Sequence, residues 1–117
     1  MGAAVTGMGV LCAIGNDTGQ VLDALRNGRS GVGRMRHLQS SHTELPVGEV
    51  SLSDDELKTL LGISASSVVS RTTLLGAVAV RQALQDAGLT PEGLKGRRVV
   101  LLSGTTVGGM DVTERLF

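Results

Sequence analysis

The sequence predicts an α/β fold for its 117 residues, and three observations point to this class. Residues 3–8 and 99–103 are short apolar segments typical of buried strands. A glycine-containing turn follows each segment. Between them, residues 70–87 have the spacing of a long helix with apolar side chains on nearly every side. This order of elements favours parallel strands joined by right-handed crossovers.

The composition supports a folded domain and argues against several classes of function. Hydrophobic residues make up 41% of the chain and charged residues 19%, which is typical of globular proteins. The formal net charge is +0, and Phe117 is the only aromatic residue, so a basic surface with stacking side chains for nucleic acid is not expected. No uninterrupted apolar run approaches the length of a membrane span. We therefore expect neither nucleic acid nor a membrane as a partner.

The cysteine and histidine content gives no support for a metal site or another cofactor. Cys12 is the only cysteine, which excludes an intrachain disulfide and suggests a cytoplasmic location. His37 and His42 lie five positions apart in a polar stretch without a thiol nearby, which is poor spacing for metal ligands. Cys12 also lacks a neighbouring base that would activate it as a nucleophile.

The first strand and the helix after it are predicted from glycines and capping residues. Gly7 and Gly9 mark the end of the strand in a close-packed turn. Either Asn16 or Asp17 can cap the helix that follows. Gly28 stands where a left-handed residue is expected at its end.

The middle of the chain predicts a surface loop, an edge strand and a short helix. Residues 28–43 are polar and partly basic, as in a solvated loop, and residues 45–50 alternate in part between apolar and polar side chains. Ser53 and Glu56 have the spacing of a capping box, and Gly62 ends the helix that they begin.

The long helix at residues 70–87 is predicted to be buried. Gly88 and Pro91 end it. A domain of this size barely covers both faces of such a helix, so we expect further protein to pack on it. Small side chains let other elements approach the helix closely; these are Gly76, Ala77, Ala79 and Ala83.

The last segment predicts a buried strand at residues 99–103, a glycine turn at 104–109, and the start of a helix at 110–117. Neither glycine turn completes a nucleotide-binding motif: Gly7 and Gly9 lack the third glycine of the dinucleotide fingerprint, and the later turn lacks a lysine and hydroxyl pair. A free-standing small α/β interaction or nucleotide-binding domain nevertheless remains one alternative.

Several segments resemble the β-ketoacyl-acyl-carrier-protein synthases. Residues 5–10 (VTGMGV), 14–16 (IGN) and 25–31 (LRNGRSG) resemble the amino-terminal segment of that family. Residues 81–89 (RQALQDAGL) resemble the end of its long buried helix, and residues 103–109 (SGTTVGG) its next strand and glycine turn. The resemblance covers nearly the whole chain in the family's order.

The resemblance implies a thiolase-like fold, of which residues 1–117 would be a partial amino-terminal domain with a mixed sheet and a buried central helix. It also implies an acyltransferase that joins an acyl thioester to malonyl-acyl carrier protein, with loss of carbon dioxide, in fatty acid or polyketide synthesis. The expected partners are acyl carrier protein, the acyl and malonyl thioesters, and a second subunit in a homodimer or heterodimer. No cofactor is implied.

The family's catalytic cysteine and two histidines lie beyond the matching region, so the resemblance implies no catalytic residue in this chain. Cys12, His37 and His42 match none of the three. We expect these 117 residues alone to be inactive. The sequence leaves open whether the parent protein is an active synthase or the family's non-catalytic partner, the chain-length factor.

One site is carried over by resemblance. Val107 matches a position that lines the acyl pocket in this family, with Gly108 and Met110 beside it. The alternative is that Val107 packs in the core, since pockets are themselves mostly apolar. Thr105 and Thr106 depart from the commonest form of the turn, so the acyl substrate is not assigned.

Overall fold

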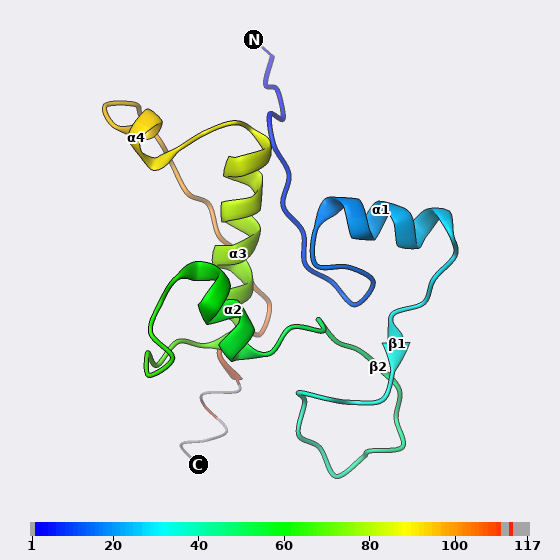
Figure 1. Ribbon diagram of the computed structural model, residues 1–117. Helices are drawn as coiled ribbons and strands as arrows, with labels where there is room; N and C mark the ends of the chain where they lie inside the picture. The colour runs from blue at the N-terminus through cyan, green and yellow to red at the C-terminus, as the bar shows by residue number, and fades with distance from the viewer. Residues whose placement is uncertain (1, 111–112, 114–117) are drawn as a thin grey trace.

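The computed structural model describes residues 2–110 and residue 113. Within these residues it is an α/β chain in which the helices are longer than the strands (Figure 1). None of the described helices is long and apolar enough to cross a membrane. The elements in chain order are α1 (Thr18–Arg26), β1 (Val32–Gly33), β2 (Val47–Gly48), α2 (Asp54–Leu61), α3 (Arg71–Asp86) and α4 (Pro91–Leu94).

Helices α1 and α2 begin and end as their capping residues predict. Asp17 caps α1 by accepting the N–H of Gln20 at 2.8 Å. In α2 the capping box is complete, because Ser53 accepts from the Glu56 N–H and the Glu56 carboxylate accepts from the Ser53 N–H. The Ser53 N–H and hydroxyl lower the pKa of Glu56. Gly62 takes φ 70° at the end of α2, a left-handed conformation that favours glycine.

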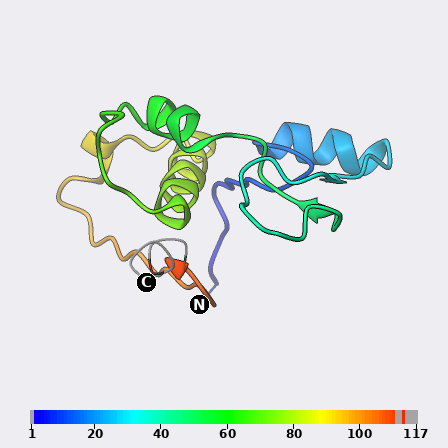
Figure 2. The ribbon, with the colours of Figure 1, turned by 90° about the horizontal axis from the view of Figure 1, so that it is seen from below.

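The core lies between α2 and α3. Leu57 of α2 and Leu74 of α3 are fully buried, and Val78 lies one turn further along α3. In Figure 2 this helix pair lies on one side of the N-terminal segment, and α1 with the β1–β2 hairpin lies on the other. Half-buried apolar side chains surround the cluster; these are Leu11, Leu52, Leu61, Val69 and Leu75.

Arg71, at the start of α3, fixes the beginning of α2 beside it. Its Nη1 donates to Asp54 Oδ1 at 2.6 Å, and its Nη2 donates to the carbonyl oxygens of Val50 and Leu52 at 3.0 and 2.9 Å. The Arg71 side chain is about three-quarters buried, and its neighbours supply both a charge and hydrogen-bond acceptors. The arrangement joins α2 and α3 at one end of their shared core.

The N-terminal segment lies along α3 (Figure 1). A Cβ on Gly7 would lie 2.2 Å from the Ala83 carbonyl oxygen, and one on Gly9 would lie 1.9 Å from that of Ala79. Both distances are far below van der Waals contact, so only glycine fits. The close approach predicted for Ala79 and Ala83 is confirmed, while Gly7 and Gly9 serve this approach rather than a turn.

The strand predictions for residues 3–8 and 99–103 are not met in the described structure, where neither segment belongs to a ladder. Side chains in both are exposed, reaching 85% for Val5 and 91% for Leu102. A strand needs a hydrogen-bonded neighbour, and neither segment has one among the described residues. In place of a mixed sheet, the described residues form one antiparallel pair, Val32–Gly33 with Val47–Gly48.

Helix α3 is also less buried than its composition predicts. Leu74 and Val78 are buried against α2, but Thr73, Ala77 and Val80 on other faces are exposed. The expectation of burial on every side is therefore wrong for these residues, because neither α2 nor the N-terminal segment covers that part of α3.

The chain after α3 contains one helix that the sequence pattern missed. Gly88 ends α3 with φ 66°, as predicted, but Pro91 begins α4 at its first position, with Thr90 as its cap. Met110 and Thr113 are helical, and the remainder of the helix predicted at 110–117 lies outside the described residues.

Candidate functional site

The glycine turn predicted to line an acyl pocket lies beside the first turn of α3. A Cβ on Gly108 would lie 2.8 Å from the Thr105 side chain and 3.0 Å from Thr72 Cγ2 of α3. The Met110 N–H donates to the Val107 carbonyl oxygen at 3.4 Å, which closes the turn. The structure thus brings Val107, Gly108 and Met110 together on one turn.

The two apolar side chains of this turn face solvent in the described chain. Val107 is 65% exposed and Met110 is 54% exposed. Neither lines the two cavities found around the β1–β2 hairpin. The alternative prediction was that Val107 packs in the core. The described residues do not bury it.

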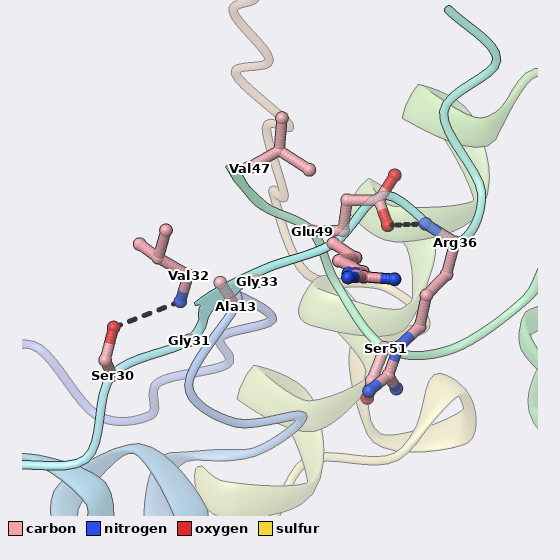
Figure 3. A pocket seen from close by; sticks show the side chains of 10 residues that line it. Ala13, Ser30, Gly31, Val32, Gly33, Arg36, Val47, Glu49 and Ser51 are labelled. Atoms are coloured by element: carbon pink, nitrogen blue, oxygen red, sulfur yellow. Dashed lines mark hydrogen bonds between the residues drawn. The ribbon is translucent and has the colours of Figure 1, made fainter. Parts of the chain in front are cut away.

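A cavity of about 250 Å³ opens where the turn after Cys12 meets the two strands (Figure 3). We call it the hairpin cavity. A second hollow of about 850 Å³ lies inside the loop that joins β1 to β2. The hairpin cavity is lined by Ala13, Ser30, Gly31, Val32, Gly33, Arg34, Arg36, Val47, Glu49 and Ser51.

Glu49 holds the loop after β1 against β2. Its carboxylate accepts the backbone N–H groups of Arg36 and Leu38, each at 2.6 Å, and that of His37 at 3.3 Å. Burial would raise the pKa of Glu49, but the N–H groups of Leu38, Arg36 and His37 outweigh burial and lower it from the usual value of 4.5. Figure 3 shows the Glu49 carboxylate facing the Arg36 N–H across the cavity wall.

Gln82 ties the N-terminal segment to α3 and was missed by sequence reasoning. Its Oε1 accepts the Val10 N–H at 3.0 Å, and its Nε2 donates to the Asn16 carbonyl oxygen at 2.6 Å. The Asn16 side chain in turn donates to Ser51 Oγ at 2.9 Å, which links the segment to the chain between β2 and α2. The signal available in the sequence was an amide side chain on a largely apolar helix, because such a group needs hydrogen-bond partners when it is partly buried, as Gln82 is.

The sulfur and imidazole side chains do not assemble into a reactive group. Cys12 is half-buried in a tight turn, where its N–H donates to the Gly15 carbonyl oxygen at 2.9 Å. His37 contacts the Ser51 carbonyl oxygen through Nε2 at 3.0 Å, and His42 lies near Glu44 on the loop. Among residues 2–110 and 113, no three His, Cys, Asp or Glu side chains are grouped so that they could hold a metal ion.

Comparison with known proteins identifies relatives over almost the whole chain. The family model described as "Beta-ketoacyl synthase, N-terminal domain" matches residues 3–116. 3-Oxoacyl-[acyl-carrier-protein] synthase 1 of Escherichia coli strain K12 is 33% identical over 108 residues, which cover 91% of this chain and 26% of that protein. Nodulation protein E of Rhizobium meliloti is 31% identical over 116 residues, which cover 97% of this chain and 28% of that protein. No solved structure matches the chain.

The chain therefore spans only about a quarter of the length of these curated relatives. The family match nonetheless extends over every segment that carried the resemblance, from residues 5–10 beside α3 to the glycine turn at 103–109. The N-terminal domain of this family implies a thiolase-like fold. By this match, the chain belongs to the β-ketoacyl synthase family.

Proposed function

We propose that these residues are the amino-terminal portion of a β-ketoacyl-acyl-carrier-protein synthase. The parent enzyme would condense an acyl thioester with malonyl-acyl carrier protein and release carbon dioxide, in fatty acid or polyketide synthesis. The observation that carries this proposal is the family match over residues 3–116. Its support is that 3-oxoacyl-[acyl-carrier-protein] synthases, by name, are among the relatives.

In this proposal the catalytic cysteine and the two histidines follow Phe117. The only thiol here, Cys12, has its backbone paired in a tight turn, and the ring nitrogens of His37 and His42 contact Ser51 and Glu44 instead of it. A nucleophile of this kind needs a base within hydrogen-bond reach. Residues 1–117 would therefore contribute structure and substrate contacts, and would be inactive when isolated.

The substrate contact that we propose is the glycine turn. Val107 and Met110 present apolar side chains that are more than half exposed in the described chain, and Gly108 lies too close to Thr105 and Thr72 to carry a larger side chain. An exposed apolar turn held in a fixed position is suited to form one wall of an acyl pocket. Acyl carrier protein would deliver the thioesters, and a second subunit would complete a homodimer or heterodimer.

The proposal is tested with the full-length protein as its own cells make it. The protein is incubated with acyl-acyl carrier protein and malonyl-acyl carrier protein, and the products are identified by mass spectrometry. We expect a β-ketoacyl product two carbons longer than the starting chain, together with one carbon dioxide per turnover. Condensation only after a related subunit is added would identify a chain-length factor instead. An inactive protein in both assays would contradict the proposal.

A Val107→Phe substitution in the full-length enzyme tests the pocket assignment. The larger ring would occupy space next to the acyl chain, so the longest accepted substrate should become shorter. The measurement is kcat/KM over a series of acyl chain lengths, with Val68→Phe, at a fully exposed valine outside both cavities, as a matched control of equal size change. An unchanged chain-length preference in a folded Val107→Phe enzyme would remove Val107 from the pocket.

A further inference from the structure

The end of helix α1 contains a chemically reactive pair of residues. Asn27 and Gly28 are adjacent, and both are exposed. In an asparagine–glycine pair the glycine nitrogen can attack Cγ of the asparagine side chain, because glycine has no Cβ that hinders the approach. Asparagine is one of the thermolabile residues of proteins. Asn16, the other asparagine of this sequence, precedes Asp17 rather than a glycine.

Asp23, one turn earlier in α1, holds the side-chain amide of Asn27. Asn27 Nδ2 donates to Asp23 Oδ1 and to the Asp23 carbonyl oxygen, each at 2.9 Å. These two bonds engage both protons of the amide nitrogen. The other carboxylate oxygen of Asp23 accepts from Arg29 Nη2 at 2.5 Å, which orients the carboxylate. The nitrogen that would leave in an attack on Asn27 is therefore bound at two points.

The attacking nitrogen is also engaged in the closed end of α1. The Gly28 N–H donates to the Leu25 carbonyl oxygen at 3.3 Å. The next N–H, that of Arg29, donates to the Ala24 carbonyl oxygen at 2.9 Å. Gly28 takes φ 60°, the left-handed conformation that such a helix end requires. Because the attacking and the leaving nitrogen are both hydrogen-bonded, the reaction requires this end of the helix to open.

We propose that Asn27 is a site of spontaneous deamidation, and that its hydrogen bonds to Asp23 keep the reaction slow while the end of α1 is closed. In the open state the Gly28 nitrogen forms a bond to Asn27 Cγ, and the bond from Cγ to Nδ2 breaks. The leaving amide group takes the proton of the Gly28 nitrogen and departs as ammonia, which leaves a cyclic succinimide. Water then opens the ring and gives aspartate or isoaspartate at position 27.

The product does not restore the closed end of α1. The Nδ2 donor to Asp23 is gone, and a carboxylate stands in its place. Two carboxylates four positions apart repel each other on a helix. A negative charge is also unfavourable at this end, where the last carbonyl oxygens are already partly negative. Deamidation thus loosens the connection from α1 to β1 in one direction only, and this change is independent of the condensing activity proposed above.

The first test compares the folded full-length protein with the same protein in guanidinium chloride, at mildly alkaline pH. Deamidation is measured by mass spectrometry as a gain of about 1 Da in a peptide that contains residues 27–28. We expect Asn27 to react in the denatured protein and to react at least about fivefold more slowly in the folded protein. The reason is that the bonds from Asn27 Nδ2 and the Gly28 N–H must break first. This comparison needs no substitution, so it does not depend on the folding of a variant.

Asp23→Ala tests the role of the carboxylate in the folded protein. The variant loses one acceptor of the Asn27 amide, so deamidation should become at least about twofold faster. Asp55→Ala, at an exposed carboxylate of α2, is the matched control and should leave the rate unchanged. Both variants are measured at a temperature at which circular dichroism shows them to be folded.

Three outcomes would overturn the proposal. Absence of deamidation at Asn27 in the denatured protein would show that the pair is not a deamidation site. Equal rates in the folded and the denatured protein would show that the end of α1 gives no protection. Equal rates in Asp23→Ala and Asp55→Ala would show that the Asp23 carboxylate does not restrain the amide.

Discussion

The α2–α3 pair and the extended segments at residues 3–8 and 99–103 are both apolar in sequence, but only the pair buries its side chains. Leu57 and Leu74 are fully buried, whereas Val5 and Leu102 are almost fully exposed. The helices satisfy their own backbone groups and need only one apolar stripe covered. The extended segments need a hydrogen-bonded neighbour as well as cover. The comparison shows that this chain encodes its helical core locally and leaves its predicted strands without partners.

The largest expected effect is on the helical core. Leu74→Ala removes a fully buried side chain between α2 and α3 and leaves a cavity, so the free energy of unfolding should fall by about 3 kcal/mol. Urea denaturation followed by circular dichroism measures this change.

Leu102→Ala is the matched control for that substitution. Because Leu102 is exposed in the described chain, the same truncation should change the stability of the 117-residue chain by less than about 0.5 kcal/mol. An equal loss from both substitutions would contradict the division into a packed pair and unpartnered segments.

The contact between the N-terminal segment and α3 should be the next most sensitive feature. Gly9→Ala places a Cβ against the Ala79 carbonyl oxygen, so the segment must move away, at a cost of about 1–3 kcal/mol. Hydrogen exchange should then become faster at the N–H groups of Met8 and Val10, which donate to Asp86 and Gln82.

Gly2→Ala controls for the loss of glycine flexibility, since nothing lies within 4 Å of the added Cβ. It should leave the exchange rates of both amides unchanged. Exchange rates at Met8 and Val10 that are the same in the Gly9→Ala variant and the unmodified protein would contradict the close contact between Gly9 and α3.

The capping box should have a smaller effect. Ser53→Ala leaves the first N–H groups of α2 without their acceptor and should lower the free energy of unfolding by about 1 kcal/mol. Ser41→Ala, at an exposed loop serine, should have no measurable effect. Equal stability of the two variants in urea denaturation would show that α2 does not depend on its cap.

The smallest effect should come from Glu49 and should depend on pH. Because the folded pKa lies below the usual 4.5, the ionised carboxylate contributes stability above pH 4.5, and this contribution is lost as the pH falls through the lowered pKa. Glu49→Gln should therefore be less stable at neutral pH, by less than about 1 kcal/mol at this part-exposed site, and should converge with the unmodified protein in acid. A stability difference between Glu49→Gln and the unmodified protein that grows in acid would contradict this stabilising role of the Glu49 carboxylate.

Sequence reasoning succeeded where the signals are local. The caps at Asp17 and Ser53, and the left-handed glycines at 28, 62 and 88, lie within a few residues of the helices that they bound. Strand pairing is different, because the partner of a strand is not specified by its own residues. The apolar run at 99–103 therefore gave no information on whether a partner lies within the described chain.

The candidate sites also combine features that the sequence indicates with contacts that only the structure shows. The glycine turn of Val107 was found through family resemblance, and its place beside Thr72 of α3 came only from the structure. The Glu49 carboxylate accepts from N–H groups 11 to 13 positions away, and the Gln82 amide bonds to Val10 and Asn16, more than 60 positions away. No periodicity in the sequence indicates such contacts, because they depend on how the elements are arranged in space.

The central claim is that these residues form the amino-terminal part of a condensing enzyme. Its most direct test is the intact mass of the protein made in its own cells, captured by an antibody against the first fifty residues, with sequencing of any extension. The account predicts a mass well above the 12.0 kDa of this chain and an extension that carries a nucleophilic cysteine and two histidines. A mass of 12.0 kDa would contradict it, because the condensing residues would then be absent.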